Sequence, residues 1–467
     1  MMELLIPLDS RSKKPLYEQI YSHICAEIRS GALKAGDRLP STRVLAEHLK
    51  VSRSTTQMAY DQLLAEGYME ARPCRGYFVS HLEELVETGS SGTLEMETTS
   101  EPDAGWRVDF SPRGIDLDSF PYHVWRKLSR NTLVDDNKEM FHSGNHQGEP
   151  GLREAIRSYL HSARGVNCSP EQIIVGAGSE YLLMLLSQIL EGKHVIAMEN
   201  PTYKQAYRVF QSLGYEVCPV EMDANGMEPE LLAKSGANAA YVMPSHQFPT
   251  GIVMPVGRRQ ELLKWAVETP DRYIIEDDYD SEFRYRGKPI PALQGMDRSG
   301  RVIYLGTFSK CIAPAIRVSY LVLPMQLLAR YRSQTSFYAS TVSRIDQNIL
   351  YQFLSGGYFE RHLNRMRAIY KTKHDLLMEQ IEPLRERFEI RGEYAGIHIL
   401  LTSQKGESEE ELIQKAAEAG VKVYGLSSYF IHPEHNHRPA TVVLGYASLN
   451  EAQIMEGVRL LMECWRA

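Results

Sequence analysis

The sequence predicts an α/β protein in two parts, an N-terminal winged helix-turn-helix and a larger doubly wound α/β domain that ends in a smaller α+β lobe. Three short helical patterns followed by two β-rich runs fill the first 80 residues, whereas β-rich runs alternate with helical ones from about residue 109 onward. A chain of 467 residues is also too long for one hydrophobic core, so several domains are expected.

The N-terminal part begins with a helix predicted over about 15–30, where apolar residues recur every four positions. Ser41 and Ser52 can each cap a following helix, because a serine hydroxyl accepts a hydrogen bond from a free N–H group of the first turn. The short runs 68–71 and 77–80 then predict a two-stranded wing. Together these elements predict a winged helix-turn-helix.

An acidic segment separates the two parts. No Lys or Arg lies between Gly76 and Trp106, while Glu and Asp accumulate among Ser, Thr and Gly. Such a composition buries too little apolar surface to offset its chain entropy, so residues 81–105 are expected to form a flexible linker. The predicted domains are therefore residues 1–80 and 106–467.

Charge and cysteine usage narrow the class of protein. The formal net charge is −7, so any nucleic-acid contact must come from a local basic face, and residues 1–80 hold 11 Lys and Arg against 9 Asp and Glu. The 6 cysteines are scattered without a C-x-x-C pair, which argues against a disulfide framework or a zinc site. With neither a secretion signal nor a long apolar run in the sequence, we expect a reduced, cytoplasmic protein.

Seven β-rich runs in the second part predict the strands of a doubly wound sheet, because helical patterns separate them. After Tyr338 the pattern becomes mostly helical, and strands at 396–401 and 441–446 predict the smaller lobe. The seven runs are Ile173–Val175, His194–Met198, Tyr215–Val220, Ala239–Met243, Tyr273–Ile275, Val302–Leu305 and Tyr320–Leu323.

One lysine carries the strongest chemical signal. Lys310 ends the run 306–310 (GTFSK), Asp277 lies thirty-three positions before it, and Arg317 lies seven positions after it. Pyridoxal 5′-phosphate (PLP) requires these three groups: an amine that forms a Schiff base with its aldehyde, a carboxylate against its pyridinium nitrogen, and an arginine on its phosphate. The sequence therefore predicts a PLP site.

Further residues fit the same cofactor. Asp277 ends a hydrophobic strand at the edge where open α/β sheets bind ligands, and Tyr279 could donate to the ring oxygen. Gly178 and Ser179 open a helix whose free N–H groups can receive a phosphate. Tyr203 is a candidate stacking platform for the ring, with plain core packing as the alternative.

In their order, these motifs resemble those of the fold-type I aminotransferases. The motifs 39–43 (LPSTR), 51–56 (VSRSTT) and 65–68 (AEGY) resemble those of GntR-type winged helix-turn-helix proteins. Joined in one chain, the two parts resemble the MocR family of transcriptional regulators over nearly the whole length. This resemblance implies that residues 106–467 form an aminotransferase class I/II-like effector domain, in a head-to-tail homodimer that binds double-stranded operator DNA and senses PLP, a small amino compound, or both.

The resemblance also assigns roles to single residues. Lys310 is implied as the Schiff-base lysine, Asp277 as the pyridinium partner and Tyr279 as the donor to the ring oxygen. The implied phosphate cradle comprises Arg317, Thr307, Ser309, Gly178 and Ser179.

A DNA-binding face is expected on the winged helix-turn-helix. Residues at the starts of the second and third helices would meet the major groove, and the tip of the wing would approach the DNA backbone or the minor groove. Arg38 and Lys34 are expected to contact phosphates. The residues of this face are Arg43, Ser52, Arg53, Thr55, Thr56, Arg75 and Gly76.

Three departures from the aminotransferase pattern bear on activity. Phe248 replaces the usual Asn before Pro-Thr-Gly, and Ser143 stands where many aminotransferases have a tyrosine. The strand 443–446 lacks the arginine that clamps a substrate carboxylate, and Arg438 is the nearest one. We therefore expect external aldimine formation with weak or absent transamination. The alternatives are a working aminotransferase with an appended DNA-binding domain, and a DNA-binding protein that has lost PLP.

Three histidines, His432, His435 and His437, lie close together and could suggest a metal site. They occupy a polar loop without a nearby cysteine, so a solvated surface loop is the preferred interpretation. No metal is assigned.

Overall fold

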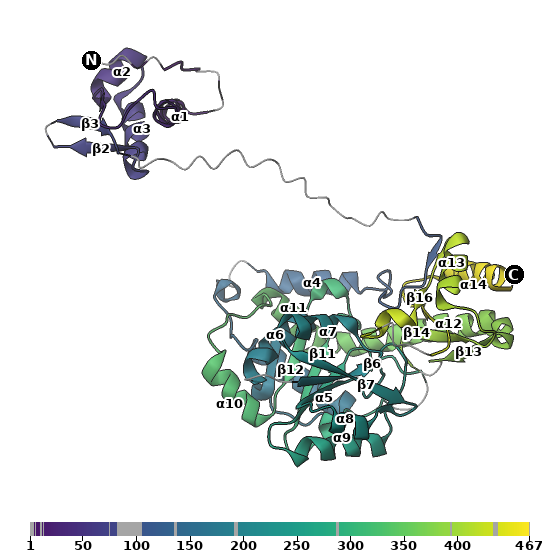
Figure 1. Cartoon of the computed structure of the whole chain (residues 1–467). Coiled ribbons are helices and arrows are strands. Elements are labelled where there is room, and N and C mark those ends of the chain that lie inside the picture. The colour runs from purple at the N-terminus through teal and green to yellow at the C-terminus, as the bar shows by residue number, and fades with distance from the viewer. Residues whose placement is uncertain are drawn as a thin grey trace. The chain divides into compact units, whose positions relative to one another are not determined.

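A computed structural model of the chain (Figure 1) divides by its internal contacts into two compact units, Met1–Glu101 and Pro102–Ala467. The predicted linker, residues 81–105, lies outside the described residues except at its two ends. None of the described helices combines the length and the apolar character that a membrane span requires. The structure describes residues 4, 6–9, 12, 14–73, 75–81, 105–134, 138–190, 195–285, 289–392, 395–432 and 438–466.

The first unit is a winged helix-turn-helix, as predicted. Its sheet is antiparallel in the order β1-β3-β2, and the short strand β1 at its edge was not predicted from the sequence. The elements are α1 (Leu16–Arg29), β1 (Arg38–Leu39), α2 (Thr42–Leu49), α3 (Arg53–Ala65), β2 (Met69–Arg72) and β3 (Gly76–Val79).

Two serine caps and one apolar core fix this unit. The hydroxyl of Ser41 accepts from the N–H group of Val44 (3.3 Å), and that of Ser52 accepts from the N–H group of Thr55 (3.1 Å), so both predicted caps are present. The apolar stripe of α1 is buried against α3, where the hydroxyl of Tyr60 donates to a backbone carbonyl at 2.9 Å. The core therefore holds α2 and α3 in one orientation.

The second unit is built on an eight-stranded mixed sheet that contains all seven predicted strands. Strands β7, β6, β9, β10 and β11 run parallel, β12 is antiparallel to both of its neighbours, and β8 pairs antiparallel with β7. In spatial order the strands are β5 (Ile173–Gly176), β12 (Ser319–Val322), β11 (Val302–Thr307), β10 (Tyr273–Asp278), β9 (Ala239–Val242), β6 (Val195–Asn200), β7 (Glu216–Asp223) and β8 (Gly226–Met227).

Helices cover both faces of this sheet (Figure 1). Side chains alternate along each strand, so Ile275 packs with α6, α7 and α10, whereas Ile274 packs with α8 and α9 on the other face. The helices are α4 (Tyr122–Thr132), α5 (Pro150–Arg164), α6 (Ser179–Leu190), α7 (Lys204–Ser212), α8 (Pro229–Lys234), α9 (Val256–Glu268), α10 (Met325–Gln334), α11 (Arg344–Ser355) and α12 (Tyr358–Ile381).

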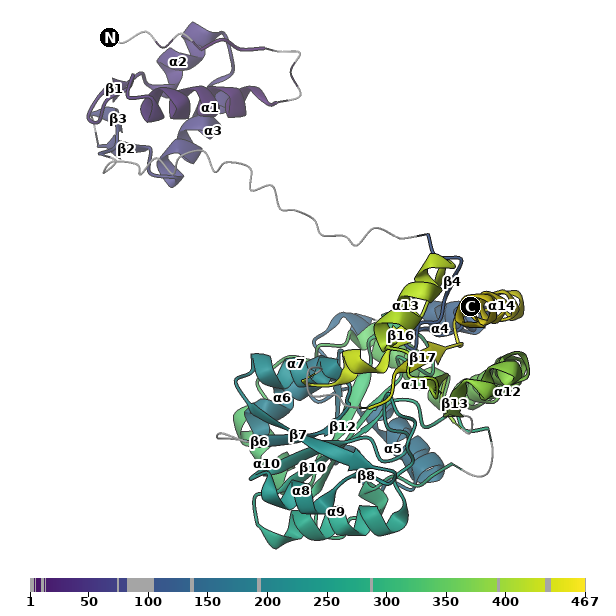
Figure 2. The ribbon, with the colours of Figure 1, turned by 45° about the vertical axis from the view of Figure 1, so that its right-hand side comes forward.

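The C-terminal part forms the predicted α+β lobe (Figure 2). Its antiparallel sheet has the order β13-β14-β17-β16, and a separate strand, β15, pairs in parallel with β4, which precedes the large domain in the sequence. The elements are β4 (Val108–Asp109), β13 (Phe388–Arg391), β14 (His398–Ser403), α13 (Glu409–Glu418), β15 (Val421–Lys422), β16 (Tyr424–Gly425), β17 (Thr441–Gly445) and α14 (Glu451–Arg466).

A buried ion pair anchors the carboxyl end of β10. The Nε atom of Arg164, at the end of α5, lies 2.8 Å from Oδ2 of Asp278, and both side chains are only 2% exposed. Tyr304 of β11 donates to the same oxygen at 2.5 Å. Because neighbouring side chains of a strand point to opposite faces, fixing Asp278 on one face directs Asp277 to the other.

Candidate functional site

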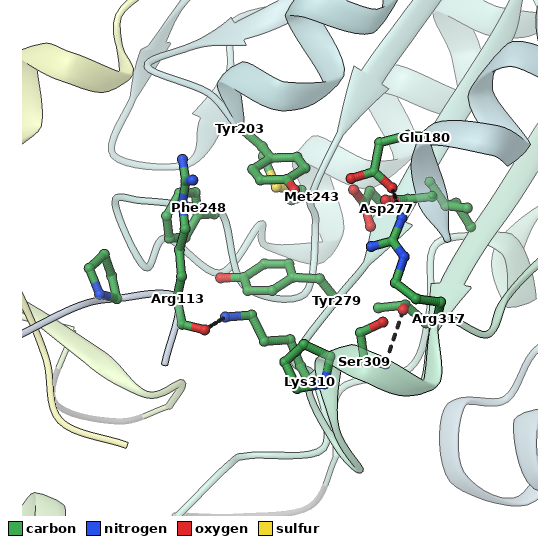
Figure 3. A pocket seen from close by; sticks show the side chains of 15 residues that line it. Arg113, Glu180, Tyr203, Met243, Phe248, Asp277, Tyr279, Ser309, Lys310 and Arg317 are labelled. Atoms are coloured by element: carbon green, nitrogen blue, oxygen red, sulfur yellow. Dashed lines mark hydrogen bonds and ion pairs between the residues drawn. The ribbon is translucent and has the colours of Figure 1, made fainter. Parts of the chain in front are cut away.

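One pocket at the carboxyl ends of the parallel strands brings the predicted cofactor residues together (Figure 3). Asp277 is the residue before the last of β10, Thr307 is the last residue of β11, and Tyr203 follows β6. Parallel strands present their carboxyl ends at one edge, so residues distant in sequence meet there. Gly178 adjoins the pocket through Arg317. The predicted residues that line it are Lys310, Asp277, Tyr279, Arg317, Thr307, Ser309, Ser179 and Tyr203.

Lys310 presents an amine that is easily deprotonated. Its Nζ atom donates to the backbone carbonyl of Arg113 at 2.8 Å (Figure 3). Loss of hydration lowers the pKa of this amine to about 8, opposed by the charge of Asp280 and reinforced by that of Arg113. The uncharged share near neutral pH is therefore much larger than for an ordinary lysine, and the uncharged amine is the form that attacks an aldehyde.

Asp277 is a buried carboxylate without a cationic partner among the described residues. Tyr241 donates a short hydrogen bond to its Oδ2 atom. Burial raises the pKa of Asp277 to about 7, although the hydrogen bond from Tyr241 opposes the shift. A protonated pyridine nitrogen would supply the missing positive charge, so the carboxylate fits the pyridinium end of PLP.

The part of the pocket beside Arg317 fits a phosphate. The guanidinium of Arg317 lies 2.7 Å from Glu180, and Arg317 itself has a left-handed backbone with φ 50°. Gly178 has φ +95°, and a Cβ atom there would collide with this guanidinium. Ser179 is the first residue of α6. The N-terminus of this helix, which is a favourable place for an anion, therefore lies beside Arg317.

Thr307, the last residue of β11, and Ser309 come just before Lys310 in the sequence and line the same pocket. The hydroxyl of Thr307 accepts from the backbone N–H group of Ser309 at 3.1 Å and from the hydroxyl of Ser319 at 2.9 Å. These bonds hold the turn that carries Lys310.

A buried histidine that the sequence did not single out contacts Tyr279. Nδ1 of His246 lies 3.0 Å from the Tyr279 hydroxyl and 2.9 Å from Oδ2 of Asp280. The side chains of His246 and Asp280 are 3% and 1% exposed. The pair of His246 and Asp280 therefore supports Tyr279 from the side away from the pocket. The sequence offered one indication of it, because His246 lies only two residues before Phe248.

Tyr203 is half-buried on the pocket wall. Its ring packs edge-on against Phe248, with ring centroids 6.2 Å apart. Burial raises the pKa of its hydroxyl to about 12. The ring is thus held by an aromatic neighbour while it still lines the pocket.

Most residues of the expected DNA-binding face lie on the surface of the first unit. Arg43, Arg53 and Arg75 are exposed, and Arg43 lies 3.2 Å from Glu47. Thr55 and Gly76 are partly exposed, and the hydroxyl of exposed Ser52 caps α3. Arg38 and Lys34, the two expected phosphate contacts, are also exposed.

Thr56 is an exception and corrects the expectation. It is fully buried, and its hydroxyl donates to the backbone carbonyls of Thr42 (2.9 Å) and Arg53 (3.0 Å). Its side chain points toward α2, where Thr42 lies. Thr56 therefore joins the two helices of the helix-turn-helix and does not reach DNA.

Of the three neighbouring histidines, His432 is described and His435 and His437 lie outside the described residues. Within the described part of the chain, no group of three or more His, Cys, Asp or Glu side chains has an arrangement that could hold a metal ion.

Comparison with known proteins matches both units. The family "Aminotransferase class I and II" matches residues 116–460, and "Bacterial regulatory proteins, gntR family" matches residues 16–79. The uncharacterized HTH-type transcriptional regulator YdeL of Bacillus subtilis is 40% identical over 455 residues, which cover 97% of each chain. The probable rhizopine catabolism regulatory protein MocR of Rhizobium meliloti is 34% identical over 99% of this chain and 96% of its own.

Among solved structures, the multiple substrate aminotransferase of Thermococcus profundus has a TM-score of 0.68 and 27% identity, over 77% of this chain and 91% of its own. The fold and the pocket define an aminotransferase class I/II-like protein, of a fold family that depends on PLP, with a GntR-type DNA-binding unit. The chain belongs to the MocR-type family of transcriptional regulators, as the sequence motifs indicated.

Replacement of Asp277 by Asn should change how stability depends on pH. The folded pKa of about 7 exceeds the value of about 3.9 in an unfolded chain, so the stability due to the protonated carboxyl is complete below pH 4 and is lost as the pH rises through 7. Relative to the wild type, cofactor-free Asp277→Asn should gain about 4 kcal/mol of folding stability between pH 4 and pH 8, since each pH unit between the two pKa values contributes about 1.4 kcal/mol.

Urea unfolding of both proteins at a series of pH values measures this difference. Asp118→Asn, which changes an exposed aspartate, serves as the matched control and should follow the wild type. Parallel stability profiles of wild type and Asp277→Asn would contradict the assigned pKa.

Proposed function

We propose that this regulator binds PLP through a Schiff base with Lys310 and responds to PLP, an amino compound, or both. The observation that carries the proposal is the convergence of Lys310, Asp277 and Arg317 in one pocket. Each group suits a different part of the cofactor, namely the aldehyde, the ring nitrogen and the phosphate.

The cofactor would supply an electrophilic carbon that exchanges the lysine amine for the amine of an effector. The residues of the pocket would orient it. Arg317 and the N-terminus of α6 would hold the phosphate, Asp277 would keep the ring nitrogen protonated, and Tyr279 would donate to the ring oxygen.

The winged helix-turn-helix would bind double-stranded operator DNA through its exposed arginines. As the limits of the two functional units we propose residues 1–80 and 106–467, joined through residues 81–105. If the effector bound one arrangement of the proposed dimer more tightly than another, it would change the fraction of the protein that is bound to DNA. Such a protein acts where its operator lies, so we place it in the cytoplasm.

Transamination is the second candidate function, favoured by the similarity to the Thermococcus aminotransferase. Two features weigh against efficient turnover. Strand β17 holds no arginine for a substrate carboxylate, and Phe248 occupies the position before Pro-Thr-Gly. Transfer of an amino group to 2-oxoglutarate at ordinary enzymatic rates would favour the enzyme, whereas a spectral response without turnover favours the sensor.

Replacement of Lys310 by Ala should abolish the covalent attachment of PLP while the protein stays folded, because no other lysine among the described residues lines the pocket. The visible absorbance band and the borohydride-reducible adduct should both disappear, and the effector response with them. DNA affinity without effector should persist. Lys264→Ala, which changes an exposed lysine of α9, is the control and should keep the band. A reducible adduct at the wild-type level in Lys310→Ala would refute the assignment.

Two substitutions in α3 should have different effects. Arg53→Ala removes an exposed guanidinium and should weaken operator binding by about 1–3 kcal/mol without changing the PLP spectrum. Thr56→Val removes a buried hydrogen bond and should lower the stability of the first unit by about 1 kcal/mol. Fluorescence anisotropy with an operator selected in vitro, and thermal unfolding, measure the two effects.

Arg298→Ala, which changes an exposed arginine of the second unit, is the control for charge and should bind the operator normally. If Arg53→Ala altered the absorbance band as strongly as it altered DNA binding, the two units would not be separable in function.

We also propose a head-to-tail homodimer, as the MocR resemblance implies. Phe141 and Phe337 are 75% and 76% exposed, and exposed aromatic side chains mark protein interfaces. Thr341, four residues after Phe337, accepts a hydrogen bond from the N–H group of Ala177 beside the proposed phosphate site. Light scattering of the PLP-loaded protein should give twice the chain mass, and a monomer at micromolar concentration would contradict the proposal.

A further inference from the structure

An arginine that no sequence motif indicated lines the same pocket. Arg113 lies in the turn 111–114, and its side chain extends beside Phe248, while Arg317 lies at the other end of the pocket in this view (Figure 3). Its backbone carbonyl holds the amine of Lys310. Among the residues that the structure describes, none forms a hydrogen bond or an ion pair with the guanidinium of Arg113.

The other two basic side chains that line the pocket, Arg317 and Lys310, already have contacts and proposed roles. Arg317 pairs with Glu180 at the proposed phosphate end, and Lys310 supplies the amine. Arg113 also lies close enough to Tyr203 and Tyr429 to affect their ionisation. Burial raises the pKa of each hydroxyl to about 12, and the positive charge of Arg113 opposes this shift. A free guanidinium in a partly apolar pocket is a binding group for a planar anion.

The turn that carries Arg113 lies directly on β17. The N–H group of Gly445 donates to the carbonyl of Phe110 at 2.8 Å, and a Cβ atom on Gly445 would collide with the backbone of Ser111 and Pro112. A Cβ atom on Gly114 would collide with Ser448. The backbone of the turn 111–114 is therefore fixed on β17, the strand that lacks the carboxylate-binding arginine of aminotransferases. Arg113 brings a guanidinium to the pocket from this turn.

We propose that Arg113 binds the carboxylate of the effector, so that the effector is an amino acid and not a simple amine. This inference rests on the proposed function, because the amine of the compound must reach the Lys310 end of the pocket. Paired hydrogen bonds from the guanidinium would hold one end of the compound while its amine lies near Lys310. Arg113 is thus a residue that determines specificity.

Matched pairs of compounds test this assignment. PLP-loaded, full-length protein is titrated with a panel of α- and ω-amino acids, and each is compared with the amine that remains when its carboxylate is removed. Alanine and β-alanine, for example, share ethylamine as their reference. The change of the visible absorbance band gives an apparent Kd for each compound.

For the wild type, at least one amino acid should bind about 10- to 100-fold more tightly than its reference amine. Arg113→Gln should abolish this preference, measured as the ratio of the two apparent Kd values in the same variant, so that any effect of the lost charge on Lys310 acts on both compounds and cancels. Arg113→Lys keeps the charge but loses the paired donors, so it should keep only part of the preference. Arg298→Gln, with its exposed side chain outside the pocket, should behave as the wild type.

Three results separate the possible failures. An undiminished preference for amino acids in Arg113→Gln overturns the assignment and leaves PLP binding intact. A wild type that prefers no amino acid to its reference amine overturns the assignment as well. Absence of the Schiff-base band before any compound is added refutes the proposed function, and the role of Arg113 falls with it.

Discussion

The cluster of buried carboxylates at the carboxyl end of β10 is the constraint on which the site depends. Each buried carboxylate needs donors or a positive charge, because burial without them is costly. Among the contacts that the described residues make with the four acidic residues at 276–280, only those of Asp277 include neither a basic side chain nor a backbone donor, and its donor is the hydroxyl of Tyr241. Glu276 accepts from the N–H groups of Leu293 and Gln294 at 2.8 Å, Asp278 pairs with Arg164, and Asp280 pairs with His246.

The order of the strands brings Asp277 together with Lys310 and Arg317 at one edge of the sheet. β11 lies beside β10, so the turn after it carries Lys310 to the same edge as Asp277. β12 runs antiparallel next to β11 and begins just after Arg317, which places this arginine beside the first turn of α6. The three groups are far apart in sequence and meet because parallel strands share one carboxyl edge.

The sequence predicted the strands and the cofactor motifs because both depend on local features. Buried parallel strands appear as short runs of β-branched and aromatic residues, and Asp277 and Lys310 lie close to the carboxyl ends of two such strands. The buried state of Thr56 was missed because capping motifs do not reveal which side of α3 faces α2. The pairing of β4 with β15 joins segments more than 300 residues apart, and Arg113 reaches the pocket through that distant packing. Long-range contacts leave no periodic signal in a sequence.

The wall of the pocket beside Tyr279 is arranged differently from the pattern expected of aminotransferases. Where that pattern has an asparagine before Pro-Thr-Gly, Phe248 packs edge-on against Tyr279, with centroids 5.8 Å apart. The polar contact comes instead from behind, since His246 lies against the tyrosine hydroxyl and is itself held by Asp280. Tyr279 is thus one of the polar groups of this wall, and its contact with His246, which Asp280 holds, fixes its orientation. Lys310 lines the same pocket with an amine that is easily deprotonated, so the departure from aminotransferases lies at Phe248 and in β17, and a group that can carry a proton is still present.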